Sequence, residues 1–250
     1  MELVLLTALG VGGATVIGAI IGFIFKRVSH TFSDIVLSFA AGVMLAAAVI
    51  GLIIPSLEHS GGPWGIAVTV IGIFVGALCL NLMDRLVPHL HGMVDADGEK
   101  HNNKNLNRVL LFVTAIAIHN LPEGIAAGVG FVSDPAEGLI IAGGIALQNI
   151  PEGMVIIAPM LAAGVKPRKT FMIAAFTGVV EVIGTFIGYF AASISGAVLP
   201  FALAFAGGTM LYVISDEMIP ETHSHGHERG ATYALLVGFC VMLVTDFLLG

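Results

Sequence analysis

Long apolar stretches alternate with short polar segments along the whole chain. A helix needs about 20 predominantly apolar residues to cross the hydrocarbon core of a bilayer. Eight stretches have about this length, at residues 3–25, 35–57, 64–86, 107–131, 137–163, 169–192, 197–219 and 231–249. The pattern therefore predicts an all-α integral membrane protein with eight transmembrane helices. Little chain is left between them, so we expect a single transmembrane domain over residues 1–250.

The composition supports this prediction. Of the 250 residues, 57% are hydrophobic and 11% are charged, whereas soluble globular domains are about 25% charged. So few charges could not cover the surface of a water-soluble fold, and most of the surface is expected to face the lipid bilayer. Ten basic residues and a net charge of −7 exclude a nucleic-acid-binding surface. The chain has no GxxxxGK[ST] phosphate loop, and we expect no catalytic cofactor.

The basic residues predict the orientation of the helices, because cytoplasmic loops carry an excess of Lys and Arg. All ten fall on one side of the eight-helix arrangement: Lys26, Arg27, Arg85, Lys100, Lys104, Arg108, Lys166, Arg168, Lys169 and Arg229. Both termini are therefore expected outside the cell, and the loops 87–106 and 220–230, which also contain histidines, in the cytosol. The predicted location is the cell membrane (inner or plasma membrane), crossed many times.

Three glutamates lie inside the apolar stretches: Glu123, Glu152 and Glu181. Ionisable groups at membrane depth are costly and usually functional. The first two glutamates belong to one motif used twice, 29 residues apart: HNLPEG at 119–124 and QNIPEG at 148–153. The duplication indicates that the two stretches contribute equivalent sides of one site.

The spacing within the motif places its polar residues on one helix face. At about 100° per residue, His119 and Glu123 lie about 40° apart, and Asn120 falls on the other side of Glu123. Gln148, Asn149 and Glu152 repeat this arrangement. Each motif proline removes a backbone N–H and leaves a carbonyl without its helical partner. We therefore expect both helices to be broken at mid-membrane, as in many transporter sites.

The combined side chains are nitrogen and oxygen ligands, with no thiolate among them. Such a set suits divalent zinc, iron, manganese or cadmium. The central carboxylates are flanked on both sides and could bridge two ions. The residues expected to contribute are His119, Asn120, Glu123, Gln148, Asn149, Glu152 and Glu181.

The paired motifs resemble the ZIP family of divalent-metal transporters, in particular its GufA-like branch, over essentially the whole chain. The resemblance implies a binuclear metal centre. One position would use His119, Glu123, Gln148 and Glu152, with Met44 nearby, and the other Asn120, Glu123, Asn149, Glu152 and Glu181. Some relatives carry Asp where this chain has Asn149. The neutral amide is expected to weaken the second position or make it more selective.

An internal repeat is visible without the family. The segment Gly42-Val43-Met44-Leu45, with a proline at 55, matches Gly208-Thr209-Met210-Leu211, with a proline at 220. The two segments run in opposite directions across the membrane. The match indicates an inverted repeat, with spans 1–3 related to spans 6–8 around spans 4 and 5, a 3+2+3 arrangement.

Polar residues at the two ends predict a path for the metal. Glu58 and His59 are expected at the outer entrance, where acidic groups concentrate cations. The residues expected at the inner exit are Asp84, His89, His91, Asp216, Glu217, His223, His225 and His227. Asp84 and Glu217 also match positions that the family uses at the exit, and histidine-rich tracts often bind metal loosely.

The predicted function is transport of divalent metal cations, foremost zinc uptake into the cytosol, with cadmium, iron, manganese and cobalt as further candidates. The chain is not expected to be an enzyme. One alternative is a membrane metal sensor or scaffold with a structural centre. Another is an intramembrane metalloprotease, although HExxH is missing. Small-residue faces such as Gly10–Ala14–Gly18–Gly22 suit close packing within one subunit or between two copies in a homodimer.

Overall fold

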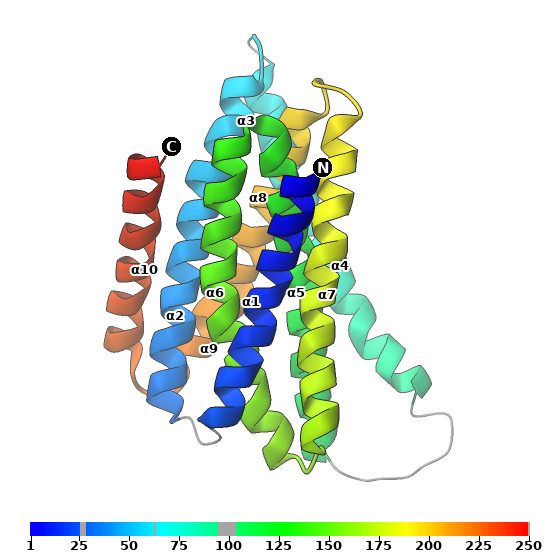
Figure 1. Ribbon diagram of the computed structural model, residues 1–250, viewed down its shortest axis with the longest axis vertical. Coiled ribbons are helices and arrows are strands. Elements are labelled where there is room, and N and C mark those ends of the chain that lie inside the picture. Colours follow the sequence, from blue (N-terminus) through cyan, green and yellow to red (C-terminus); the bar gives the residue numbers. More distant parts are fainter. Residues whose placement is uncertain (26–28, 63, 95–103, 250) are drawn as a thin grey trace.

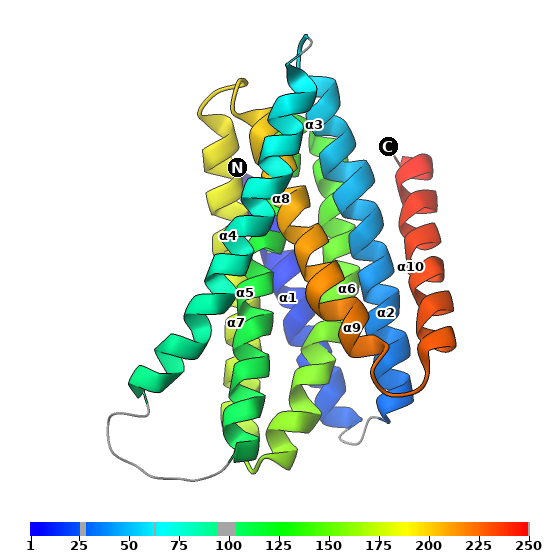
Figure 2. The same cartoon turned by 180° about the vertical axis from the view of Figure 1, so that it is seen from behind.

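The computed structural model describes the backbone of residues 1–25, 29–62, 64–94 and 104–249. Every regular element in these ranges is helical, as the sequence predicts (Figure 1, Figure 2). Its elements are α1 (Glu2–Ile24), α2 (His30–Ala46), η1 (Ala47–Ile53), α3 (Ile54–His59), α4 (Gly65–Val94), α5 (Lys104–Ser133), α6 (Pro135–Ala162), α7 (Pro167–Ser193), α8 (Leu199–Val213), η3 (Ile214–Met218), α9 (Ile219–Thr222) and α10 (Glu228–Leu249).

Two of the long helices contain a π-helical segment. η1 joins α2 to α3, and η3 joins α8 to α9. A proline follows each segment closely, Pro55 in α3 and Pro220 in α9. Proline lacks the N–H that an α-helix requires, and a local π segment accommodates the interrupted hydrogen-bond ladder. The two irregular helices therefore share one construction, although they lie far apart in the sequence.

The helices form two groups. α1, α5, α6 and α7 pack on one another, and α2, α4, α8 and α10 form pairs in which α2 lies against α10 and α4 against α8. α2 packs on α6, and α8 packs on α5, so these two pairs join the groups. In Figure 1, α10 stands at one edge beside α2, and α1, α6 and α7 face the viewer. The doubled motif lies on α5 and α6, the helices of the first group that pack on α8 and α2 of the second group.

Glycines set the spacing of the first group. A Cβ on Gly18 of α1 would meet the carbonyl oxygen of Ile150 on α6, and a Cβ on Gly184 of α7 would meet that of Leu121 on α5. Ile150 and Leu121 occupy the same position of the two motifs. Such direct backbone contact is the usual role of small residues in membrane helices. The small-residue face of α1 is thus used within the subunit at Gly18.

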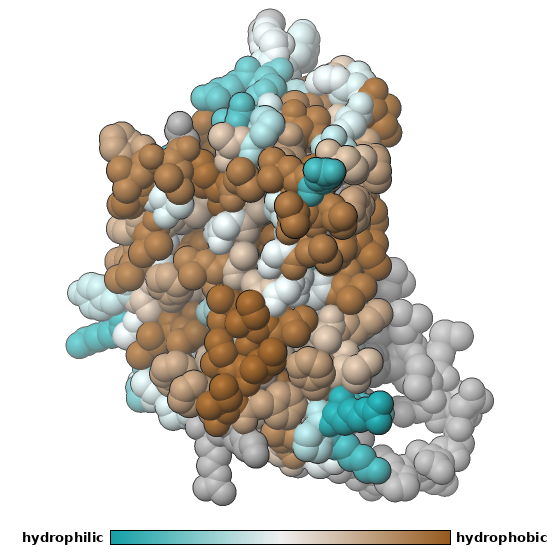
Figure 3. Space-filling model, viewed as in Figure 1, coloured by the Kyte–Doolittle hydropathy of each residue, from teal (hydrophilic) through white to brown (hydrophobic). Residues whose placement is uncertain are grey.

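The outer surface carries the apolar belt of a membrane protein. Large exposed hydrophobic side chains cover α1, α4, α7 and α10, including Phe74, Phe176 and Phe247. Brown dominates the surface between the two ends in Figure 3. Within the described residues, seven helices are long and apolar enough to cross a membrane. α5 is not among them; it carries the polar residues of the first motif.

The prediction of helices broken at the motifs is wrong. α5 continues through Pro122 and α6 through Pro151 and Pro159. The ring of proline fixes φ near the helical value, so the loss of one N–H need not end a helix whose faces are well packed. The glycine after each motif glutamate also has another role: a Cβ there would strike the backbone of Glu181 from Gly124, and of Thr15 from Gly153.

Both predicted histidine-containing loops are shorter than expected. α4 extends to Val94 and α5 begins at Lys104, so much of 87–106 is helical. At the second loop, α9 reaches Thr222 and α10 starts at Glu228, which leaves only 223–227 between helices. The apolar pattern underestimates these helices because their polar ends extend beyond the hydrophobic stretch.

The close contact at Gly18 is testable. We expect Gly18→Ala to lower the free energy of unfolding in detergent by about 1–3 kcal/mol, because the methyl group overlaps a backbone carbonyl. The matched control is Gly10→Ala on the same helix, since an added Cβ at Gly10 meets nothing within 4 Å. Its expected effect is neutral or a gain of up to about 1 kcal/mol from helix propensity. Thermal unfolding measures both, and equal melting temperatures would contradict the packing role of Gly18.

Candidate metal centre

The seven motif and glutamate residues predicted to form a site come together in the interior. α5 supplies His119, Asn120 and Glu123, α6 supplies Gln148, Asn149 and Glu152, and α7 supplies Glu181. All seven are buried: His119 is 8% exposed, Glu152 is 7% exposed, and the other five are fully inaccessible to solvent. Residues up to 62 positions apart in sequence thus share one polar interior inside an apolar helix bundle.

Glu181 is held by donors from three other helices. Its Oε1 accepts a hydrogen bond of 2.6 Å from the hydroxyl of Thr15 on α1 and another from the amide of Asn120 on α5. Its Oε2 accepts a hydrogen bond of 2.6 Å from Asn149 Nδ2 on α6. Hydrogen bonds to a charged acceptor are stronger than neutral ones, so Glu181 connects α7 to α1, α5 and α6.

A second contact joins the two motifs directly. Gln148 Nε2 donates to Glu123 Oε1 over 2.7 Å. Among the described residues, four buried oxygens of this set have no hydrogen-bond donor: Asn120 Oδ1, Glu123 Oε2, Gln148 Oε1 and Asn149 Oδ1. Buried acceptors without a partner are rare in proteins. Amide and carboxylate oxygens of this kind are the atoms that bind divalent cations, so the donor set fits a metal ion as cargo.

Described His, Cys, Asp and Glu side chains do not already form a cluster of three or more arranged as a metal site. The nitrogen atoms of Asn120, Asn149 and Gln148 face the carboxylates. A cation between these groups would require the amides to turn their oxygens inward. The candidate ligands therefore lie close together, but the amides present their N–H groups, and not their oxygens, to the carboxylates.

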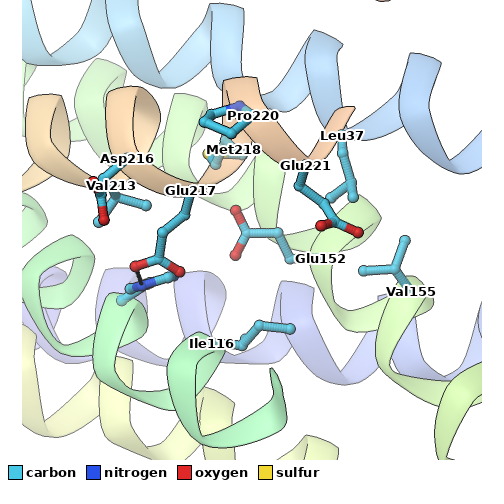
Figure 4. A pocket seen from close by; sticks show the side chains of 11 residues that line it. Leu37, Ile116, Glu152, Val155, Val213, Asp216, Glu217, Met218, Pro220 and Glu221 are labelled. Carbon is cyan, nitrogen blue, oxygen red and sulfur yellow. Dashed lines mark hydrogen bonds and ion pairs between the residues drawn. The ribbon is translucent and has the colours of Figure 1, made fainter. Parts of the chain in front are cut away.

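His119 and Glu152 face a cavity of about 380 Å³ between α5, α6 and the α8–η3–α9 segment. Figure 4 shows Glu152, Glu217 and Glu221 with their carboxylates directed into this space. His119 Nε2 lies 2.5 Å from Glu217 Oε1. Asp216 and Glu221 are exposed, whereas His119 and Glu152 are buried. The cavity thus connects the motif residues to the surface through a series of carboxylates.

Glu217 therefore lies closer to the centre than predicted. The sequence placed it at the exit, yet it contacts the motif histidine across the cavity. The π-helical segment η3 carries both Asp216 and Glu217. Asp216 lines the same cavity, so the structure brings these two predicted exit residues to the motif.

The other predicted pathway residues are placed individually. Met44 is fully buried in a hydrophobic cluster with Leu52 and Ile145, and a role as ligand stays a prediction. Glu58 and His59 are exposed at the end of α3, where His59 Nδ1 lies 2.9 Å from Pro55 O. The side chains of Asp84, His89 and His91 lie outside the described residues, although their backbone belongs to α4.

The histidines of the 223–227 segment do not converge. His223 contacts Ile219 O through Nδ1 at 2.9 Å and the hydroxyl of Thr232 through Nε2 at 3.1 Å. His225 Nδ1 lies 3.1 Å from Asp34 Oδ1 on α2, and His227 is exposed. Two of the three therefore fasten the turn to neighbouring helices.

Sequence reasoning missed three polar residues of this region: Thr15, Asp34 and Glu221. Asp34 is 2% exposed and pairs with the histidine turn, and Glu221 lines the cavity. The signal for Glu221 was its place after Pro220 in the repeated segment. Thr15 and Asp34 are isolated polar residues in apolar helices, and only their tertiary contacts distinguish them from packing residues.

The chain is similar to known proteins of one family over nearly its whole length. Residues 95–246 match the family model of the ZIP zinc transporter. The chain is 40% identical to "Zinc transporter GufA" of Myxococcus xanthus over 253 residues, covering 98% of each chain. It is 37% identical to "Zinc transporter ZIPB" of Bordetella bronchiseptica, covering 95% of this chain and 78% of the relative. It is 30% identical to human "Zinc transporter ZIP11", covering 95% and 94%.

The family model covers more than half of the chain, and relatives at 30–40% identity span nearly all of it. The duplicated HNLPEG and QNIPEG motifs, through which the sequence resembles this family, are the ones that the fold brings together. The apolar belt and the long helices agree with the same assignment. This chain belongs to the ZIP zinc transporter family and is a multi-pass integral protein of the cell membrane.

Proposed function

We propose that this protein carries divalent metal cations, foremost Zn²⁺, into the cytosol through a centre on α5, α6 and α7. The observation that carries the proposal is the pair of equivalent motifs whose buried carboxylates face amide and imidazole ligands. The chain belongs to the ZIP family, and its relatives are named as zinc transporters. We therefore interpret this set of ligands as the cation site. Cd²⁺, Fe²⁺, Mn²⁺ and Co²⁺ suit the same ligands.

The first metal position is assigned to His119, Glu123, Gln148 and Glu152, with Met44 as a further candidate. Two carboxylates neutralise a single dication at this position. His119 Nε2 is also the atom that contacts Glu217, and a ring nitrogen that shares a proton with a carboxyl group has no lone pair left for a metal ion. Metal binding at His119 would therefore displace Glu217, and return of Glu217 would favour release toward the cavity.

The second position is assigned to Asn120, Glu123, Asn149, Glu152 and Glu181. The unpartnered oxygens of Asn120 and Asn149 support it, since these atoms become ligands when the amides rotate. Two dications would bring the charge of the three carboxylates from −3 to +1, which makes the second ion weaker than the first. The position is thus proposed as an accessory one.

The proposed arrangement is eight spans in a 3+2+3 inverted repeat with both termini outside. Paired contacts support the repeat: α1 packs on α6 as α7 packs on α5, and α2 packs on α10 as α8 packs on α4. The two π segments, one before each matched proline, support it further. Both termini lie toward the upper end in Figure 1, opposite the basic α6–α7 turn, as the positive-inside rule requires.

The same orientation makes the cavity a path to the cytosol. Pro220 and Glu221 of α9 line it, and α9 lies in the half of the molecule that ends in the basic α6–α7 turn (Figure 2). The carboxylates of Asp216, Glu217 and Glu221 then form the inner part of the pathway, and Glu58 and His59 the outer entrance. The membrane potential drives a dication inward by about 4.6 kcal/mol per 100 mV.

A metal sensor or scaffold is the alternative function. It would use the same centre for stability alone and would bind metal without flux. The relatives are named as transporters, and the cavity that connects the buried centre with the surface favours a role in which ions move.

We expect Glu123→Gln and Glu152→Gln each to reduce Zn²⁺ uptake into proteoliposomes at least tenfold. Each change removes one negative charge and one oxygen ligand from the centre but preserves the side-chain size. Glu137→Gln is the matched control, because Glu137 lies in the first turn of α6 and its carboxylate accepts a hydrogen bond from the hydroxyl of Ser133. Uptake by both variants at the wild-type rate would refute the central site.

We expect an inside-negative potential to accelerate Zn²⁺ uptake into wild-type proteoliposomes. Net movement of positive charge is favoured by about 2.3 kcal/mol per charge per 100 mV. Uptake at several imposed potassium gradients with valinomycin measures the dependence. A rate that does not respond to the potential would show electroneutral transport, and metal binding without any uptake would favour the sensor.

We expect simultaneous replacement of His223, His225 and His227 by Asn to change the uptake rate by no more than about threefold. Their side chains bond to neighbouring helices or face solvent, and none touches the motif residues among the described contacts. Initial rates of zinc uptake across a concentration series measure the effect. Complete loss of uptake in a folded variant would place these histidines on the obligatory pathway.

A further inference from the structure

Thr15 is the polar contribution of α1 to the centre. After Glu2, this helix has no ionisable residue, and Thr15 is fully buried. Its Oγ1 donates to Glu181 Oε1 over 2.6 Å. A hydroxyl in an apolar helix often bonds only to the carbonyl one turn earlier. Thr15 instead reaches across to a carboxylate on α7, which distinguishes it from a packing residue.

The surroundings of Thr15 and Glu181 are equivalent. Three glycines of α1, Gly12, Gly18 and Gly22, each have a glycine 166 positions later in α7, and Thr15 is separated from Glu181 by the same offset. An added Cβ on Gly12 would meet Gly178 O, and the reverse also holds. Thr15 thus occupies in α1 the place that Glu181 occupies in α7.

The contacts with the motifs follow the same equivalence. A Cβ on Gly153, the residue after Glu152, would meet the carbonyl oxygen of Thr15. A Cβ on Gly124, the residue after Glu123, would meet that of Glu181. The backbone of Thr15 is therefore fixed against the second motif while its hydroxyl is fixed on Glu181.

A bound cation would leave the hydrogen bond of Thr15 to Glu181 intact but would break those of the two amides. A cation among the oxygens of Asn120, Asn149 and Glu181 requires both amides to turn away their N–H groups. The hydroxyl of Thr15 approaches from α1 and can keep donating to Oε1 after the amides have turned. It is then the one described donor that holds the carboxylate in place whether or not the ion is bound.

We propose that Thr15 is a positioning residue of the metal centre: its hydroxyl fixes the Glu181 carboxylate and thereby sets the affinity of the metal position on that side. The inference rests on the proposed function and adds a residue from α1 to it. A hydroxyl at the place equivalent to Glu181 also keeps the centre at three carboxylates instead of four. With three carboxylates, the second dication to bind brings the centre to a charge of +1 and is therefore the weaker of the two.

The experiment measures binding of Cd²⁺ to the purified full-length protein in detergent, by calorimetry and by ¹¹³Cd NMR, which gives one signal for each bound ion. The variants are Thr15→Val, which keeps the shape and removes the hydroxyl, and Thr15→Ser, which keeps the hydroxyl. Thr7→Val is the matched control, since Thr7 is also buried on α1 but lies about two turns away. Thermal unfolding and Zn²⁺ uptake by the wild type accompany the measurement.

Two bound ions are expected in the wild type, in Thr15→Ser and in Thr7→Val. Thr15→Val should weaken the second ion at least tenfold and leave the first ion and its signal unchanged. Wild-type affinity for both ions in Thr15→Val overturns the inference. So does loss of both ions together with folding, or a wild type that transports zinc but binds one ion. A wild type that neither binds nor transports metal refutes the proposed function as well.

Discussion

Three glutamates buried among apolar helices are the constraint on which the rest of this structure depends. An ionised carboxylate at membrane depth needs compensation. Glu181 is compensated by three hydrogen-bond donors and Glu123 by one. Those donors must come from other helices at short range. The glycines that let α1 approach α6, and α7 approach α5, are the consequence.

Compensation is unequal across the centre. Both oxygens of Glu181 accept hydrogen bonds, far from solvent, whereas Glu152 faces the cavity and His119 meets a carboxylate from η3. A cation at the proposed first position would displace the contact of Glu217 with His119 and would turn one amide, that of Gln148. A cation beside Glu181 has to reorient two amides. The geometry therefore provides an exchangeable side and an anchored side within one cluster of ligands.

The sequence was sufficient for the helical class and the family, and it singled out the seven polar residues that the fold buries together, because each depends on a local pattern. Apolar length predicts helices, and the i, i+4 spacing of His119 and Glu123 predicts a shared face. It failed where tertiary packing decides. Pro122 and Pro151 were expected to break helices that the neighbouring helices keep continuous. Thr15 gave no signal until its distance from Glu181 was known, and the contact of Glu217 with His119 joins residues 98 positions apart.

The division of the helices constrains how the exposure of the centre could change. Every residue assigned to the metal except Met44 lies on α5, α6 or α7, which pack with α1 through backbone contacts at glycine. The wall opposite His119 and Glu152 comes from α2 and the α8–η3–α9 segment of the other group. Separating the ligands would break hydrogen bonds to buried carboxylates, whereas shifting α5 and α6 against α2 and α8 would not. For the proposed transport, a movement between the two groups would therefore cost fewer hydrogen bonds to buried carboxylates than a rearrangement within the first group.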